Sequence, residues 1–296
     1  MIAFVYQATV ISRGAVGKSF GSPVVRCIIP YLHRHFSANE SNNRLWGIKV
    51  NPESIGNSIL PGGEYCLKHD PRTHADRRVR VEHNYGYFWM VSDLAKTKNK
   101  PIVSNKTIIP ETEAESFPTL INCQEMKNDE DIVLPDYFLR DNRANDPSAQ
   151  CTLVAISYKD HGQKLLKSWT EPFEQFYGSS QNRAKVMSLF ITEGDFTAFL
   201  LASMQKRTIR SKTDPKLLSR TLVRFGSSGL LEFNDALRMH NMLTGYVYLL
   251  DGLGRVRFAG SGEASEKEVQ NLIKFAKTIT PKLCEEKISD NRNDTK

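Results

Sequence analysis

Residues 245–264 read GYVYLLDGLGRVRFAGSGEA, a pattern that sets the end of the fold. Two strand-like runs, Tyr246–Leu250 and Arg255–Phe258, flank the turn 251–254 (DGLG), where glycine supplies the positive φ of a tight antiparallel connection. The run GSG at 260–262 then leads towards a polar, helix-like segment. The sequence therefore predicts a β-hairpin followed by a helix.

The predicted final helix has clear boundaries. Ser265 and Glu268 have the spacing of a capping box, and Pro281 ends the pattern. The apolar positions repeat at helical intervals, namely Val269, Leu272, Ile273 and Ala276.

The glycines at 260–262 do not match a nucleotide-binding loop. A dinucleotide fingerprint follows a parallel strand and continues into a further strand, whereas this segment follows a hairpin. The third glycine position is Ser265, and the chain contains no GxxxxGK[ST] run. We expect these glycines to allow a sharp turn from the sheet to the last helix.

A second unit precedes the hairpin. The short apolar runs 151–157 (CTLVAIS) and 186–192 (VMSLFIT) are typical of buried strands. Residues 162–177 between them have helical apolar spacing, with Pro172 predicting a kink or a restart at Thr170. The order strand, helix, strand predicts a parallel βαβ unit.

Two further helices are expected between this unit and the hairpin. The first is marked by Phe196, Phe199, Leu200 and Ser203, and ends in basic residues. The second starts at Asp214-Pro215, and we expect its inward face to contain Leu217, Leu218, Leu222 and Val223.

A βαβ half followed by a ββα half is the organisation of the thioredoxin-like fold, so we expect an α/β protein with a mixed sheet flanked by helices. Redox members of that fold carry reactive cysteines at the start of the first helix, where the thiol pKa is lowered. Residues 157–162 (SYKDHG) contain no cysteine, and 242–245 (MLTG) replaces the usual cis-proline. The scaffold is therefore predicted to lack disulfide-exchange chemistry.

The N-terminal 36 residues account for much of the net charge of +7. They contain four basic residues and no acidic one, and without them 36 basic side chains face 33 acidic ones. This composition and the run RHFS at 34–37 are typical of a mitochondrial transit peptide with a matrix-processing site. We therefore predict a transit peptide at 1–36 and no strong generic attraction to nucleic acid.

The rest of the chain is predicted to divide into three parts: a basic and aromatic extension (37–113), a thioredoxin-like domain (114–281) and a polar tail (282–296). Within the extension, 85–89 (YGYFW) is an aromatic burst that precedes a helix capped at Ser92-Asp93. Residues 124–150 are acidic and predict a surface excursion. The five cysteines have no metal-knuckle spacing, and cations surround Cys66, His69 and His74, so no metal site is expected.

Residues 83–279 resemble the mitochondrial ATP synthase assembly factors that chaperone subunit a (subunit 6) of the Fo sector. The resemblance rests on GYF (86–88), DL (93–94), TKNK (97–100), FP (117–118), SWTEPF (168–173) and the C-terminal stretch 245–265. It implies a non-enzymatic role on the matrix face of the inner membrane, in which the protein binds newly made subunit a and promotes its joining to the c-ring.

The resemblance supplies no catalytic residue, cofactor or metal. From the residues themselves, we expect client or membrane binding by the aromatic burst and the basic segment before it, that is, by Tyr87, Phe88, Trp89, Arg72, Arg77, Arg78 and Arg80. The basic side chains would contact anionic lipid of the inner membrane.

Two other functions remain open at this point. A thiol-dependent antioxidant or reductase on the same fold would need one reactive, exposed cysteine. A matrix nucleic-acid-binding protein would use the arginine-rich segment and stacking on 85–89.

Overall fold

The computed structural model describes residues 47–59, 86, 88–140, 150–177, 184–193 and 195–280. All of them belong to one compact unit, Ser41–Lys296. The predicted transit peptide (1–36) and polar tail (282–296) lie outside the described residues.

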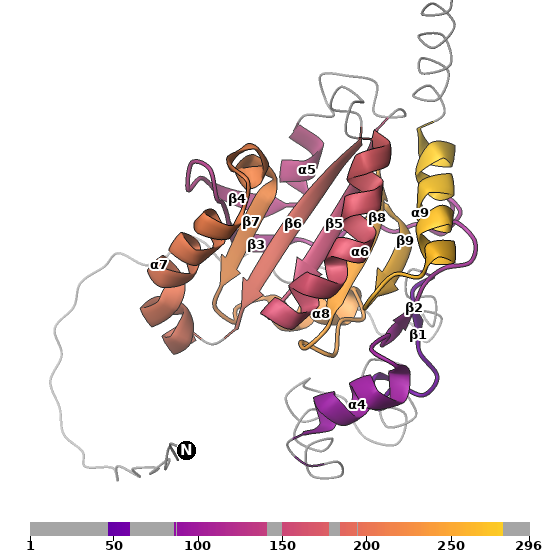
Figure 1. The fold of residues 1–296 in the computed structure, drawn as a ribbon, viewed down its shortest axis with the longest axis horizontal. Helices are drawn as coiled ribbons and strands as arrows, with labels where there is room; N and C mark the ends of the chain where they lie inside the picture. Colours follow the sequence, from indigo (N-terminus) through magenta and orange to yellow (C-terminus); the bar gives the residue numbers. More distant parts are fainter. Residues whose placement is uncertain are drawn as a thin grey trace, which may run out of the picture. The chain divides into compact units, whose positions relative to one another are not determined.

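A seven-stranded sheet with the order β4-β3-β7-β6-β5-β8-β9 forms the centre of this unit (Figure 1). Strands β5, β6 and β7 are parallel, and every other neighbouring pair is antiparallel. The strands are β3 (Leu120–Glu125), β4 (Asp131–Leu134), β5 (Cys151–Ser157), β6 (Ala184–Thr192), β7 (Thr221–Phe225), β8 (Gly245–Asp251) and β9 (Val256–Ser261).

The four strands β6-β5-β8-β9 carry the thioredoxin-like pattern that the sequence predicts. Helix α6 (Asp160–Tyr177) joins the parallel pair β5–β6, and the hairpin β8–β9 leads into α9 (Glu266–Ile279). The predicted capping box of Ser265 and Glu268 is present at the start of α9. The fold prediction is therefore confirmed.

Helices α6 and α9 cover one face of these strands. Leu166, Trp169 and Phe173 of α6 pack with Leu272 and Phe275 of α9 against the sheet. The ring of Trp169 is fully buried, and its Nε1–H donates to the carbonyl of Gly262 at 2.8 Å. Gly260 is needed beneath that ring, because a Cβ there would lie 3.0 Å from it. Gly260 thus serves close packing, while Gly262, with a φ of 68°, lies in the turn towards α9 that the sequence predicts.

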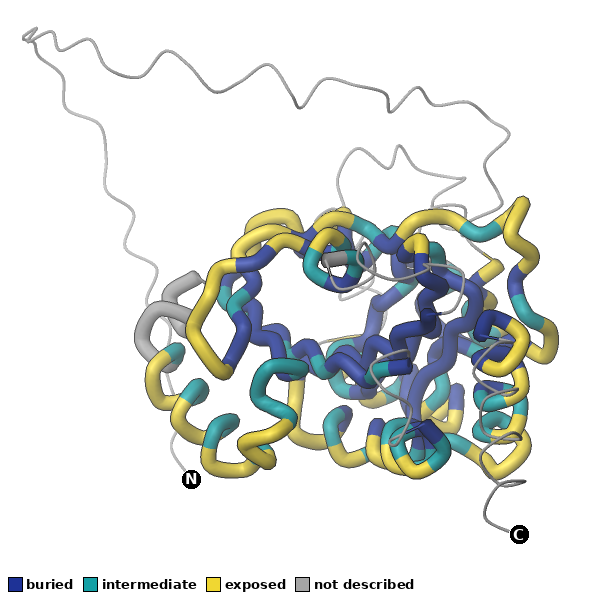
Figure 2. The backbone as a smooth tube through the Cα atoms, turned by 90° about the horizontal axis from the view of Figure 1, so that it is seen from above, coloured by how far each residue is buried: buried dark blue, intermediate teal, exposed yellow. Residues whose placement is uncertain are grey.

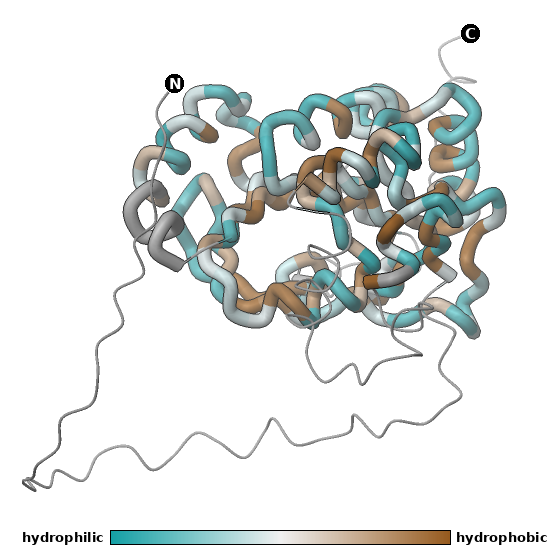
Figure 3. Tube along the Cα trace, turned by 90° about the horizontal axis from the view of Figure 1, so that it is seen from below, coloured by the Kyte–Doolittle hydropathy of each residue, from teal (hydrophilic) through white to brown (hydrophobic). Residues whose placement is uncertain are grey.

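The opposite face is closed by several elements together. They are α8 (Leu230–Ala236), α5 (Asp136–Arg140) and the segment before β3. Phe117 lies at their centre, with edge-to-face contacts to Phe138, Phe233 and Tyr248. Figure 2 shows buried residues concentrated in the strands, and Figure 3 shows the same strands as the most hydrophobic part of the trace.

The N-terminal extension is bound to the sheet. It contains β1 (Lys49–Val50), α1 (Gly56–Ile59), α4 (Trp89–Thr97) and β2 (Ile102–Val103), with β1 and β2 paired. Residues 105–115 run beside β9: the amides of Asn105 and Ile109 donate to β9 carbonyls, and Val256 donates to Glu115. These bonds occupy the outer edge of β9, which would otherwise be open to pairing with another chain.

Three local predictions were wrong. The helix predicted from Asp214 is a short 3-10 helix, η2 (Pro215–Arg220), and Leu222 and Val223 lie in β7 instead. Helix α4 starts at Trp89, so Asp93 is a buried interior residue rather than part of a cap. Pro172 lies inside an uninterrupted α6, so the helix does not restart at Thr170.

The acidic stretch also differs from the prediction. Residues 124–134 form part of the hairpin β3–β4, which extends the sheet beyond β7, and α5 follows them. Helix α7 (Asp195–Lys212) agrees with the expected helix after β6, but it continues beyond the basic pair Lys206-Arg207.

Candidate functional site

The first turn of α6 is the position at which redox proteins of this fold carry their thiols. Here β5 ends at the buried Ser157, and Lys159, Asp160 and His161 are exposed. Gly162 packs directly on the loop before β8, because a Cβ at this residue would lie 2.5 Å from the carbonyl oxygen of Thr244. The turn is thus closely packed on one side and polar on the other, and it contains no sulfur.

The two cysteines in the described part of the chain lie elsewhere. Cys123 is in β3 and Cys151 is the first residue of β5, at the far end of that strand from α6's first turn. Both are buried and free, and burial raises the pKa of each thiol to about 12. Since the thiolate is the nucleophile, these two side chains are inert at neutral pH. Cys27, Cys66 and Cys284 lie outside the described residues.

A buried polar cluster joins the extension to the loop before β8. The Asp93 side chain of α4 is fully buried and accepts hydrogen bonds from Ser54 Oγ at 2.6 Å and from Asn241 Nδ2 at 2.8 Å. His240 Nε2 lies 3.3 Å from Asp93 Oδ2 and 2.7 Å from Ser54 Oγ. We call these four residues, Ser54, Asp93, His240 and Asn241, the clasp.

Serine, histidine and aspartate side by side suggest a hydrolase triad, but the geometry of the clasp differs. In a triad, the serine and the carboxylate bind opposite nitrogens of the imidazole. Here both face Nε2, while Nδ1 faces the carbonyl of Arg238 at 3.2 Å. Ser54 is also buried, so substrate has no access to its hydroxyl. The clasp is a structural element.

Counting donors gives the direction of the hydrogen bond from Ser54. A carboxylate only accepts, so the single hydroxyl proton of Ser54 goes to Asp93. The Ser54 oxygen then faces Nε2 of His240 as an acceptor. Burial alone would raise the pKa of Asp93, but the hydrogen bond and charge of His240, with the bonds from Ser54 and Asn241, bring that pKa below its usual value.

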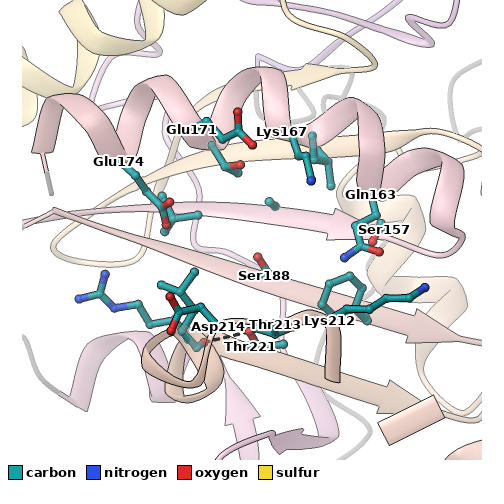
Figure 4. Close-up of a pocket in the computed structure, with 17 residues that line it drawn as sticks. Ser157, Gln163, Lys167, Glu171, Glu174, Ser188, Lys212, Thr213, Asp214 and Thr221 are labelled. Carbon is teal, nitrogen blue, oxygen red and sulfur yellow. Dashed lines mark hydrogen bonds between the residues drawn. The ribbon is translucent and has the colours of Figure 1, made fainter. Parts of the chain in front are cut away.

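A groove of about 220 Å³ lies beside α6 on the face that α6 and α9 only partly cover (Figure 4). Its floor comes from β5, β6 and β7, where Ser188 and Phe190 of β6 are half-exposed. Its walls are α6 on one side and η2 with the end of α7 on the other. Charged side chains line both walls, namely Lys167, Glu171, Glu174, Lys212, Asp214 and Arg220.

No metal-binding cluster of three or more His, Cys, Asp or Glu side chains occurs in the described part of the chain. No described helix is both long and apolar enough to cross a bilayer.

Comparison with known proteins shows the family of this chain. The sequence model of the ATP10 protein family matches residues 64–279, well over half of the chain. The chain belongs to the ATP10 family. Members of this family are ATP synthase assembly factors, which agrees with the resemblance found in the sequence. A search of curated protein sequences gave no significant match.

Solved structures similar to this ATP10-family chain have thioredoxin-like folds. BsSco, described as a member of the Sco family of cytochrome c oxidase assembly proteins, is 9% identical with a TM-score of 0.39, over 60% of this chain and 99% of its own. A DsbF homologue from Corynebacterium diphtheriae is 11% identical with a TM-score of 0.35, over 58% and 89%. The thioredoxin domain of a Bacteroides vulgatus thiol-disulfide oxidoreductase is 10% identical with a TM-score of 0.36, over 55% and 96%. Similarity this low carries no argument about activity.

Only two of the seven binding residues predicted from the sequence lie in the described part of the chain. Arg72, Arg77, Arg78, Arg80 and Tyr87 lie outside the described residues. Of the remaining two, Phe88 is 71% exposed, whereas Trp89 is 2% exposed and packs with Ile55 and Ile59. Their role in binding a client or lipid stays a prediction, and in this structure Trp89 has a packing role.

Sequence analysis missed both the clasp and the groove. The family match begins at residue 64, so Ser54 of the clasp lies before it. The available signal was the position of Asp93 on α4. Its spacing places it on the same face of the helix as the buried residues Trp89, Leu94 and Thr97. A carboxylate on such a face requires a buried partner.

Proposed function

We propose that this protein is a non-enzymatic assembly factor of the mitochondrial ATP synthase that binds newly made subunit a and promotes its joining to the c-ring. The observation that carries the proposal is the ATP10 family match on a thioredoxin-like scaffold whose α6 turn contains no cysteine. Its place of action is the matrix face of the inner membrane, as the composition of residues 1–36 supports.

The need for such a factor follows from the client's chemistry. A membrane subunit that conducts protons has polar and charged groups at bilayer depth, which are costly until they are partnered. A bound factor keeps these groups from aggregation and delays contact with the rotor ring. This role requires a binding surface and no catalysis.

Phe88 and Val91 provide one candidate client surface. Phe88 caps the N-terminal end of α4, and Val91 follows it in the first turn of that helix, with 71% and 54% of their surfaces exposed. Adjacent exposed apolar side chains are typical of protein-binding surfaces. The basic segment 68–80 precedes them in sequence and supports contact with anionic lipid.

The direct test is affinity capture of the tagged protein from mitochondria while organelle-encoded subunits are being labelled. We expect newly labelled subunit a to co-purify. The double variant Phe88→Ser, Val91→Ser should capture less of it, whereas Leu253→Ser, which changes a side chain of 57% exposure in the β8–β9 turn, should capture as much as the wild type. Absence of subunit a from the wild-type capture would refute the proposal.

The same capture experiment distinguishes the proposed function from that of a thiol-dependent antioxidant or reductase. A reductase acting on its client would hold it through a mixed disulfide that reducing agent releases. We expect the captured amount to be unchanged by reductant added before lysis.

A further inference from the structure

The groove beside α6 contains charged side chains that make few direct contacts within the fold. Among the described residues, Lys167, Glu171, Glu174 and Arg220 make no hydrogen bond or ion pair, although all four line one groove. Lys212 makes only a distant contact of 3.8 Å with Asp160. Unpaired charges of both signs in one groove are complementary to a ligand that also carries both signs.

The lysines and the glutamates occupy different parts of the groove, and Arg220 of η2 acts electrostatically on Glu174. In Figure 4, Lys212 lies near Gln163 and Ser157 at one end, and Glu174 lies at the other, with Lys167 and Glu171 between them on α6. We call the part formed by Lys167 and Lys212 the lysine end, and the part formed by Glu171 and Glu174 the glutamate end. The lysine end lies towards the N-terminus of α6.

The size of the groove argues against a cofactor. A volume of about 220 Å³ is smaller than the roughly 300–1,000 Å³ of pockets that enclose drug-sized molecules. Its floor is reachable, since Ser188 and Phe190 are half-exposed, and Leu166, Val186 and Leu217 add apolar surface. An open groove with an apolar floor and charged walls suits a few side chains of a polypeptide.

We propose that this groove binds a peptide segment of the client protein, with an acidic side chain at the lysine end and a basic side chain at the glutamate end. The proposal rests on the proposed function for the identity of the client. Lys167 and Glu174 are seven residues apart on one helix, which corresponds to about 10 Å along its axis. An extended peptide covers that distance in about three residues, so the two client charges lie about three positions apart.

The state of Glu174 is consistent with a cationic side chain as the occupant. Burial raises the pKa of this carboxyl group; the Arg220 guanidinium opposes the rise, and the Glu171 carboxylate adds to it. A basic side chain entering the groove would relieve the repulsion between the two glutamates. Arg220 already opposes this repulsion at Glu174 without forming an ion pair, and a basic client side chain would add to its effect.

The first part of the test uses synthetic peptides and the full chain. An eight-residue fluorescent peptide with one glutamate and one arginine three positions apart should bind, as measured by anisotropy, and should shift the amide resonances of β6 and α6. The variant Glu171→Gln, Glu174→Gln should weaken binding roughly tenfold, which corresponds to about 1.4 kcal/mol. The matched control Glu232→Gln, at an exposed position of α8, should not. Equal binding of a peptide with glutamine at both charged positions, or no binding, would overturn the proposal.

The second part repeats the capture of newly labelled subunit a with the charge-reversed variant Glu171→Lys, Glu174→Lys and with Glu232→Lys as control. We expect loss of subunit a only from the groove variant. If subunit a still co-purifies at the wild-type level, the groove proposal fails while the proposed function stands. If the peptide binds as expected but the wild type captures no subunit a, the groove stands and the proposed function fails.

Discussion

The two faces of the sheet are covered to different extents. One face is closed by the extension, α8 and α5, and the buried polar side chains of the clasp bind one another. On the other, α6 and α9 bury their own strip of sheet but leave β6 half-exposed beneath a groove with unpaired charges. The closed face therefore serves stability, whereas the open face carries the charged groove that we propose as a binding site.

The largest expected effect on stability concerns the part of the open face that α6 and α9 cover. Replacing Trp169 by alanine removes a fully buried ring and its hydrogen bond to Gly262, and should lower the free energy of unfolding by roughly 3–5 kcal/mol. Urea unfolding measures this effect. Lys164→Ala on the exposed side of α6 is the control. An unchanged unfolding midpoint for Trp169→Ala would place that ring at the surface and reopen it as a binding residue.

The clasp should be almost as costly to break. Asp93→Asn removes the buried carboxylate that accepts from Ser54 and Asn241 and lies 3.3 Å from His240 Nε2, with a cost of about 3 kcal/mol. Hydrogen exchange should speed up most in α4 and β2, because the clasp fixes the extension, and much less in α9. The double variant Asp93→Asn, His240→Gln should lose less than the sum of the two single variants. Strict additivity would show that the two side chains do not interact.

The third prediction concerns the loss of stability as the pH falls below neutral. The pKa of Asp93 is lower in the folded protein than its ordinary value of 3.8, so its contribution is present above about pH 4 and is lost as the pH falls through the folded value. Glu268 acts in the same sense: burial opposes the change, but bonds from Lys100, Ser104 and Ser265 lower its pKa. Unfolding measured from pH 6 to pH 2 should be less pH-dependent in Asp93→Asn than in the wild type. Identical slopes would contradict the clasp.

The smallest effect should come from the groove. Glu171→Gln with Glu174→Gln should change the free energy of unfolding by no more than about 0.5 kcal/mol, or stabilise slightly, because these charges make no ion pair in the fold. Thermal unfolding tests this directly. A clear loss of stability would mean that the groove charges serve the fold and would weaken the contrast between the two faces.

The parts of the fold that the sequence predicted are those with local signals. The apolar runs of β5 and β6 and the capping box of α9 are recognisable within a few residues. Strand β7 was missed because Leu217, Leu218, Leu222 and Val223 also match helical spacing after a helix start at Asp214. Its identity depends on pairing with β6 and β3, which are distant in sequence.

The sites were beyond sequence reasoning for the same reason. Ser54 and His240 of the clasp are 186 positions apart, and no local pattern brings them together. The groove joins side chains from α6, three strands and η2. What the sequence shows by itself is that no cysteine occurs at 157–162, because that position is local to the end of one strand.

The central claim is that this scaffold acts by binding, without sulfur chemistry. Its most direct test is a chain with all five cysteines, Cys27, Cys66, Cys123, Cys151 and Cys284, replaced by alanine and expressed in cells that lack the native protein. With folding verified by thermal unfolding, the account predicts that fully assembled ATP synthase on native gels reaches the wild-type level. A folded cysteine-free chain that fails to restore assembly, while restoring any single cysteine rescues it, would contradict the account.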